Sequence, residues 1–170
     1  MDSAPQNMNG VLIVAYGNPV RSDDGVAWRV AETLEGKFAP QQVEILTLHQ
    51  LAPELADTAS GFDHIFFIDA APPDPAADSS PGKLRIEEIR TQDIDPDRKT
   101  RFSHALTPRD VLALTQALYH SFPRAFSIVI TGENLDHGES LSDSVAAVLP
   151  DLVERIRERI QECLWTESRI

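Results

Sequence analysis

Hydrophobic and polar residues alternate along this chain with two periods, one typical of strands and one typical of helices. Short apolar runs predict buried strands at 11–15, 65–68 and 127–130, and alternation predicts strands at 43–48 and 83–90, the second more exposed. Helical spacing of apolar residues predicts helices at 26–34 and 52–59, from Pro108 onward, and along 145–160. Pro150 interrupts the last stripe, which predicts either a kinked helix or two helices that meet there.

Strands that alternate with helices in this way predict an α/β fold. We expect residues 1–170 to form a single three-layer αβα domain. Its centre would be a mostly parallel five-stranded sheet with one antiparallel edge strand. Parallel strands present the loops at their carboxyl ends along one edge, where ligands bind in open α/β sheets. Polar residues in those loops are therefore the candidates for chemistry.

The loop after the first strand contains two adjacent carboxylates, Asp23 and Asp24, just before a predicted helix. Either residue could cap that helix, because a carboxylate accepts hydrogen bonds from the free N–H groups of the first turn. On this loop alone the cap is the favoured interpretation. A dinucleotide site is disfavoured, because residues 15–20 contain one of the three glycines of that fingerprint.

Further polar residues are predicted at the same edge of the sheet. Asp69 ends the third strand in the chain, His104 precedes a helix, and Glu133 follows the last strand. Two carboxylates and an imidazole are suitable ligands for a divalent metal and would leave coordination positions open. A turn role for Asp69 and a plain polar role for His104 remain alternatives. His137 lies in the same polar loop as Glu133 and is a secondary candidate.

Composition narrows the classes of partner. The net charge of −12 argues against nucleic acid, whose phosphates require clustered Lys and Arg. No apolar run approaches the ~20 residues that span a bilayer, so no membrane partner is expected. A single cysteine, Cys163, excludes an intrachain disulfide. The first ten residues lack the pattern of a signal peptide, and we expect a cytoplasmic monomer.

Several of these residues together resemble a known family. The segment Gly17-Asn18-Pro19, Arg21 and Asp23–Val26 resembles the opening motif of the hydrogenase maturation proteases. The likeness continues through Ile68–Ala70, through Ser103-His104 followed by Asp110–Leu112, and through the strand at 128–130. It covers essentially the whole chain in the order of the family.

This resemblance implies an endopeptidase that removes the C-terminal extension of the nickel-loaded large-subunit precursor of a nickel-iron hydrogenase. Asp24, Asp69 and His104 would bind the nickel and form the catalytic site. The nickel would come with the precursor, and a surrogate divalent metal would occupy the site in isolation. Possible substrate contacts are Asn18, Asp23, Glu133 and His137. Two other functions remain open: a non-catalytic, nickel-dependent checkpoint or chaperone for the same precursor, and a flavodoxin-like protein that binds a small molecule or nucleotide.

The chain departs from the family pattern at two positions. Ala15 and Ala27 stand where the family usually has glycine. Inside the predicted helix at 26–34, alanine should stabilise by up to ~1 kcal/mol relative to glycine. At the end of the first strand, the methyl group of Ala15 would narrow the approach of a ligand to the backbone. We expect neither change to abolish the site.

Overall fold

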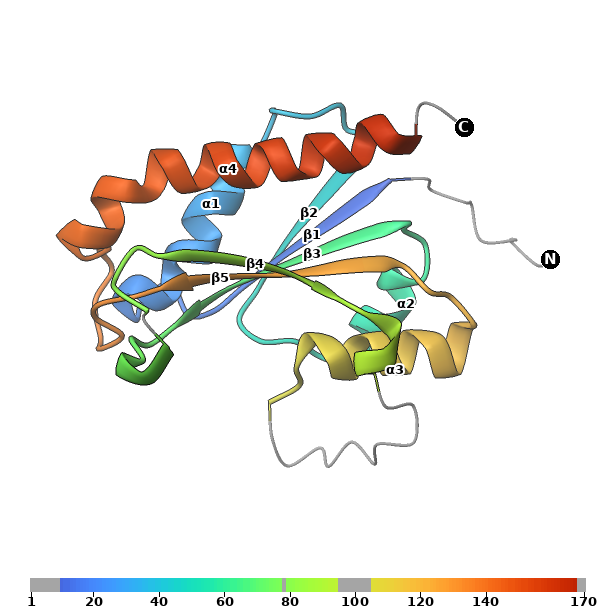
Figure 1. Ribbon diagram of the computed structural model, residues 1–170, viewed down its shortest axis with the longest axis horizontal. Coiled ribbons are helices and arrows are strands. Elements are labelled where there is room, and N and C mark those ends of the chain that lie inside the picture. The colour runs from blue at the N-terminus through green and yellow to red at the C-terminus, as the bar shows by residue number, and fades with distance from the viewer. Residues whose placement is uncertain (1–9, 78, 95–104, 168–170) are drawn as a thin grey trace.

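The computed structural model describes residues 10–77, 79–94 and 105–167, and it arranges them in three layers (Figure 1). The sheet consists of β1 (Val11–Tyr16), β2 (Val43–Leu48), β3 (His64–Ala71), β4 (Leu84–Ile89) and β5 (Arg124–Thr131). The helices are α1 (Val26–Leu34), α2 (Leu55–Ala59), α3 (Pro108–Tyr119) and α4 (Asp143–Glu167). Short 3-10 turns lie at η1 (Ser22–Gly25), η2 (Pro75–Ala77) and η3 (Thr91–Asp93). The predicted α/β class is confirmed.

The strand order is β2-β1-β3-β5-β4, with β4 antiparallel to β5 and the other pairs parallel. The predicted mostly parallel sheet with one antiparallel edge strand is therefore confirmed. From β1 the chain moves outward to β2 and then returns to place β3 on the other side of β1. The strand order reverses between β1 and β3, and a crevice forms at such a switch point outside the carboxyl ends of the strands.

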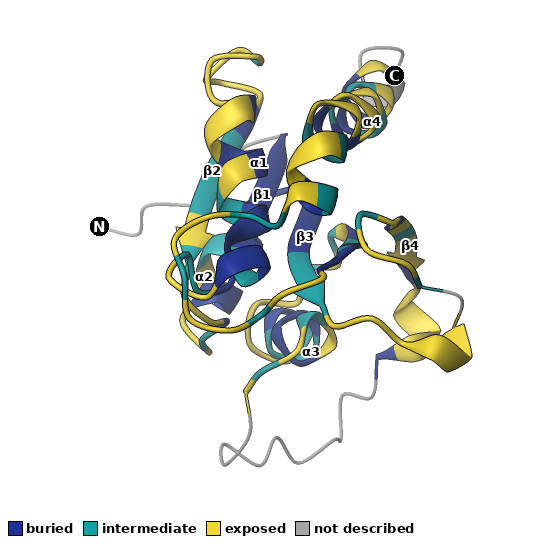
Figure 2. Ribbon diagram, turned by 90° about the vertical axis from the view of Figure 1, so that its left-hand side faces the viewer, coloured by how far each residue is buried: buried dark blue, intermediate teal, exposed yellow. Residues whose placement is uncertain are grey.

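Two apolar cores hold the layers together, because side chains alternate between the faces of each strand. One face packs against α1 and α4, and the other packs against α2 and α3. Figure 2 shows β1 and much of β3 as buried between these helices. Within the first core, the rings of Phe66 and Phe126 stack with their centroids 4.8 Å apart. This packing fixes the carboxyl ends of β1 and β3 side by side.

Several element boundaries differ from the sequence prediction. β3 extends through Ala71, so Asp69 lies inside the strand, because its neighbour β5 continues the ladder through the pairs Asp69–Val129 and Ala71–Thr131. The last stripe forms one helix, α4, with Pro150 inside it, so the two-helix alternative is wrong.

The predicted start of α3 is confirmed by its cap. The Thr107 hydroxyl accepts a hydrogen bond from the Asp110 N–H, and the Asp110 carboxylate accepts one from the Thr107 N–H, which forms a capping box. Among the described residues, none of the helices has both the length and the apolar character that crossing a membrane requires.

Candidate active site

The turn after β1 sets the position of Asp24. Gly17 has a φ of +142°, and a Cβ atom there would lie 2.2 Å from the backbone oxygen of Asp24. Only glycine permits so close an approach, so the chain folds back on itself at this point. The N–H of Asn18 then donates to Asp24 Oδ2 at 2.9 Å. One carboxylate is thereby held at the carboxyl end of β1, at the switch point of the sheet.

Asp69 brings a second carboxylate to the same place from the neighbouring strand β3. Its Oδ1 accepts a hydrogen bond from the Ala70 N–H at 2.8 Å, and the Tyr16 hydroxyl donates to its carboxylate. Burial, reinforced by the negative charge of Asp24, raises the pKa of Asp69 to about 6 against the opposing effect of those two hydrogen bonds. Burial, together with the charge of Asp69, also raises the pKa of Tyr16. Asp24 and Asp69 therefore lie close enough for the charge of one to act on the other.

Two neighbouring carboxylates, one of them with a raised pKa, suit two kinds of chemistry, cation binding and proton transfer. A positive charge beside Asp69 would favour the ionised form of its carboxylate. His104, the third predicted ligand, lies outside the described residues. In the part of the chain that the structure describes, no group of three His, Cys, Asp or Glu side chains is placed to hold a metal ion. The structure thus brings together two of the three predicted ligands.

Asp23 has a different environment from its neighbour Asp24. It is fully buried, and its Oδ2 accepts hydrogen bonds from the N–H groups of Glu133 and Asn134 at 2.8 and 2.9 Å. Ser142 donates to the same carboxylate from both its N–H and its hydroxyl, at 2.8 and 2.7 Å. Burial alone would raise the pKa of Asp23, but these hydrogen bonds hold it below its ordinary value. Asp23 thus ties the loop after β5 to the loop after β1, and it faces inward.

The cap interpretation of this loop is wrong. The N-cap of α1 is Gly25, and no side chain forms a cap hydrogen bond there. The carboxylates of Asp23 and Asp24 are both bonded elsewhere, Asp23 to the 133–142 loop and Asp24 to Asn18. The burial of Asp23 also leaves it no exposed surface for the substrate contact that the sequence suggested.

The other predicted contact residues lie around the same edge of the sheet. The Glu133 carboxylate accepts a hydrogen bond from the Ser144 hydroxyl near the start of α4. His137 is exposed, and the residue after it, Gly138, exchanges backbone hydrogen bonds with the loop after β1. Asn18 holds Asp24 through its N–H. Contact of Asn18, Glu133 and His137 with a substrate stays a prediction.

Tyr16 is a site residue that the sequence reasoning missed. It is the last residue of β1 and directly follows the pair Ala15–Ile68, so it stands beside Asp69. Its hydroxyl donates a hydrogen bond to the Asp69 carboxylate and so orients it. Only the register of β1 and β3 places Tyr16 beside Asp69. That register cannot be read from the sequence of either strand alone.

Comparison with known proteins shows what this chain is similar to. No family model matches the sequence. A curated relative, the hydrogenase 2 maturation protease of Escherichia coli, is 27% identical over 157 residues, which cover 89% of this chain and 91% of the relative. The chain is thus similar to a hydrogenase maturation protease over most of its length.

Solved structures of hydrogenase maturation proteases share its fold. The hydrogenase maturating endopeptidase HybD of Escherichia coli superposes with a TM-score of 0.66 at 23% identity, covering 90% of this chain and 93% of that one. The NiFe hydrogenase maturation protease HybD of Thermococcus kodakarensis gives a TM-score of 0.65 at 24% identity, covering 89% and 99%. This chain therefore shares its three-layer fold with those endopeptidases.

Proposed function

We propose that this chain is the endopeptidase that removes the C-terminal extension from the large-subunit precursor of a nickel-iron hydrogenase once nickel is in place. The similarity to hydrogenase maturation proteases supports an enzyme that hydrolyses peptide bonds. The observation that carries the finer proposal is the pairing of Asp24 and Asp69 at the switch point of the sheet, with the pKa of Asp69 raised to about 6. Such a pair is adapted to a cation brought in by the substrate.

In this proposal the nickel belongs to the substrate. Asp24 and Asp69, together with His104, complete its coordination and so hold the bond to be cut beside it. A bound divalent metal polarises a carbonyl or lowers the pKa of a water molecule. The positive charge of the metal favours the ionised form of the Asp69 carboxylate, against the effect of its burial. Tyr16 and the Ala70 N–H keep that carboxylate oriented.

The metal also serves as a mark of completion. In this proposal the site is complete only when the precursor brings its nickel. A precursor without nickel then has no metal to polarise the scissile carbonyl or to activate a water molecule. The irreversible cut is thereby delayed until the metal has been inserted. This dependence separates the proposed protease from one with a resident metal, which would cut both forms of the precursor.

The site is tested by Asp24→Asn and Asp69→Asn, with Asp151→Asn as the matched control on an exposed turn of α4. Each protein is incubated with nickel-loaded precursor, and loss of the C-terminal peptide is followed by intact mass. We expect both site variants to lose activity by about 100-fold or more, the scale of a lost catalytic group, with the melting temperature retained. The control should cut normally.

Two results would contradict the proposal. Normal processing by either site variant would remove the carboxylate pair from the mechanism. A wild-type protein that binds the precursor but leaves its mass unchanged would favour the non-cutting checkpoint.

A further inference from the structure

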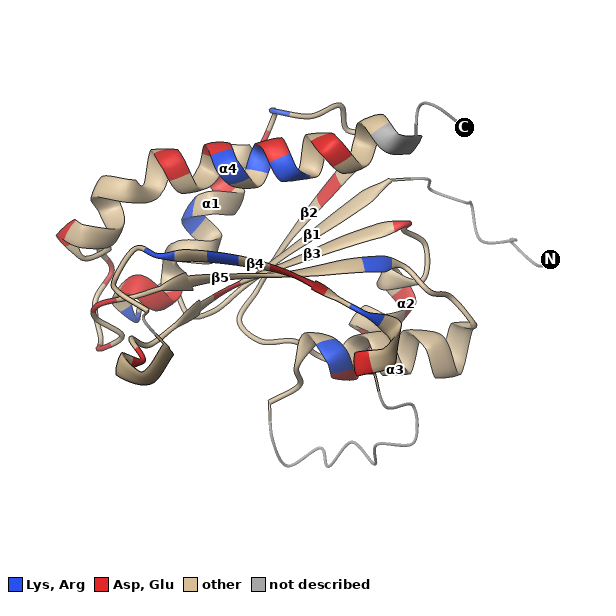
Figure 3. Cartoon of the chain, in the orientation of Figure 1, with Lys and Arg blue, Asp and Glu red and all other residues tan. Residues whose placement is uncertain are grey.

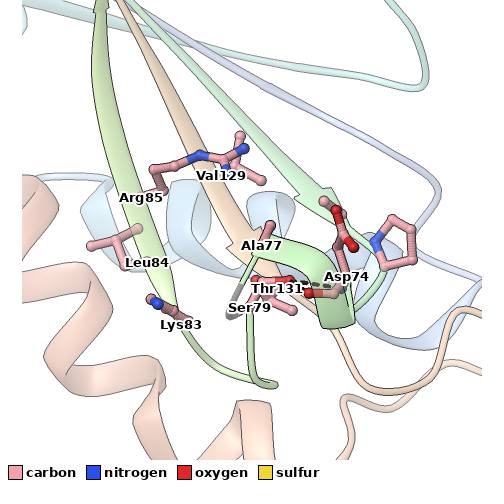
Figure 4. Close-up of a pocket in the computed structure, with 10 residues that line it drawn as sticks. Asp74, Ala77, Ser79, Lys83, Leu84, Arg85, Val129 and Thr131 are labelled. Atoms are coloured by element: carbon pink, nitrogen blue, oxygen red, sulfur yellow. Dashed lines mark hydrogen bonds between the residues drawn. The ribbon is translucent and has the colours of Figure 1, made fainter.

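A cavity of about 370 Å³ opens beside the carboxyl ends of β3 and β5, bounded by β4 and by loop residues 72–77 and 79. Figure 4 shows the side chains that line it: Lys83 and Arg85 come from the β4 side, and Asp74 and Ala77 come from the loop opposite. The Arg85 side chain reaches across toward Val129 on β5. None of these residues belongs to the carboxylate pair described above, although the cavity lies close to that pair.

The strand register connects the cavity to the active site. Asp69 pairs with Val129 on β5, and Val129 pairs in turn with Arg85 on β4. Paired residues of neighbouring strands project from the same face of a sheet, so Asp69 and Arg85 share a face two strands apart, about 10 Å. An extended peptide covers that distance in about three residues. A substrate held at Asp69 therefore reaches the cavity a few residues from its scissile bond.

The charge of the cavity contrasts with that of the chain as a whole. The net charge is −12, yet Lys83 and Arg85 both line this cavity. Figure 3 shows basic and acidic positions along β4. Asp74 is the acidic residue in the lining, and its Oδ1 accepts a hydrogen bond from the N–H of Ala76 at 2.9 Å within its own loop. The contact of Arg85 with Glu87 is 3.4 Å long between side chains that are 55% and 62% exposed. Exposed ion pairs of this kind are weak. A carboxylate of the substrate that is buried in the cavity would therefore compete well with Glu87 for the Arg85 guanidinium.

We propose that this cavity is a specificity subsite that binds an acidic side chain of the precursor, about three residues from the bond that is cut. The inference rests on the proposed function, since it gives the cavity the same substrate. An arginine guanidinium presents parallel donors that match the two oxygens of a carboxylate. Lys83 adds a second positive charge. Loop residues 72–77 and 79 line the side of the cavity opposite β4.

The test compares wild type, Arg85→Glu and Arg85→Gln on nickel-loaded precursor, with Arg155→Glu as the control. Arg155 is exposed on α4, across the sheet, so its replacement makes the same change of net charge away from the cavity. We expect Arg85→Glu to lower kcat/KM by about tenfold or more, mainly through KM, because a charge-assisted hydrogen bond becomes a repulsion. Arg85→Gln should lose less, and Arg155→Glu should stay within about twofold of wild type.

Charge reversal on the substrate gives the decisive result. A precursor in which the acidic residue near the cut is replaced by lysine should be a poor substrate for wild type and a better one for Arg85→Glu. An unchanged kcat/KM for Arg85→Glu, with wild type active, would overturn the subsite and leave the proposed function standing. A cognate precursor with no Asp or Glu within about five residues of the cut would overturn it as well. If wild type leaves the precursor uncut, the proposed function and the subsite fall together.

Discussion

At the scale of single residues, the fold gives two adjacent aspartates opposite tasks. Asp24 is half-buried and lies beside Asp69 at the open edge of the sheet, whereas Asp23 is fully buried and holds a loop. The partners of Asp23 are more than a hundred positions away in the sequence. No local pattern reveals partners so distant, so the pattern of residues could predict two carboxylates in a ligand-binding loop but not their separate roles. Only the resemblance to a known family singled out Asp24 as a metal ligand.

The structural role of Asp23 predicts a large loss of stability on truncation. Asp23→Ala would leave the N–H groups of Glu133, Asn134 and Ser142 without their acceptor in a buried place. An unpaired buried donor costs about 1–3 kcal/mol, so we expect the free energy of unfolding in urea to fall by roughly 3 kcal/mol or more. Asp136→Ala, an exposed change in the same loop, should stay within about 0.5 kcal/mol of wild type. Equal effects of the two variants would contradict this role.

The lowered pKa of Asp23 also predicts a dependence on pH. An aspartate in an unfolded chain has a pKa of about 3.9. Hydrogen bonding in the folded protein holds the pKa of Asp23 below its ordinary value. Its stabilising contribution is therefore complete above the unfolded pKa and is lost as the pH falls through the folded pKa. We expect the difference in free energy of unfolding between wild type and Asp23→Asn to shrink as the pH is lowered from about 6 to about 3. Urea titrations at several pH values measure it, and a constant difference would refute the assignment.

At the scale of elements, apolar periodicity predicted the strands and helices well because each of them buries one face or both. The strand at 43–48 and the helix at 26–34 have the predicted bounds. β3 and β5 run longer than their apolar cores, since ladder hydrogen bonds with neighbours extend them through polar residues such as Asp69 and Thr131. Polar strand ends are invisible to a hydrophobic pattern, and the active site is built from one of them.

The single helix α4 leads to an element-scale prediction. Pro150 lies inside it and is exposed, and proline has no N–H to donate to the preceding turn. Pro150→Ala should therefore restore one helical hydrogen bond without disturbing the core. Proline costs a helix interior about 3 kcal/mol, partly offset by its stiffening of the unfolded chain, so we expect a gain of about 1–2 kcal/mol in the free energy of unfolding.

Urea unfolding of wild type and Pro150→Ala measures this gain. Processing of the precursor should be unchanged, because Pro150 is exposed on α4 whereas Asp24 and Asp69 lie at the carboxyl ends of β1 and β3. A fall in stability would mean that the helix has adapted its packing to the proline ring.

At the scale of the whole molecule, the order of the strands decides where chemistry can occur. The switch point between β1 and β3 brings Asp24 and Asp69 together although 44 residues of chain lie between them. The sequence predicted that their loops would share an edge, because parallel strands in an α/β sheet point the same way. It did not give the strand order, and so it could not show which pair of loops would be neighbours. The cavity beside Arg85 was missed for the same reason, since it depends on β4 lying next to β5.

The central proposal is that this chain cuts a hydrogenase large-subunit precursor only when that precursor carries nickel. The measurement that tests it most directly is the intact mass of a hydrogenase large-subunit precursor after incubation with the wild-type protein, in nickel-loaded and nickel-free forms. The account predicts loss of a single C-terminal peptide from the loaded form and no change in the nickel-free form. Equal cutting of both forms, or no cutting of either, would contradict it.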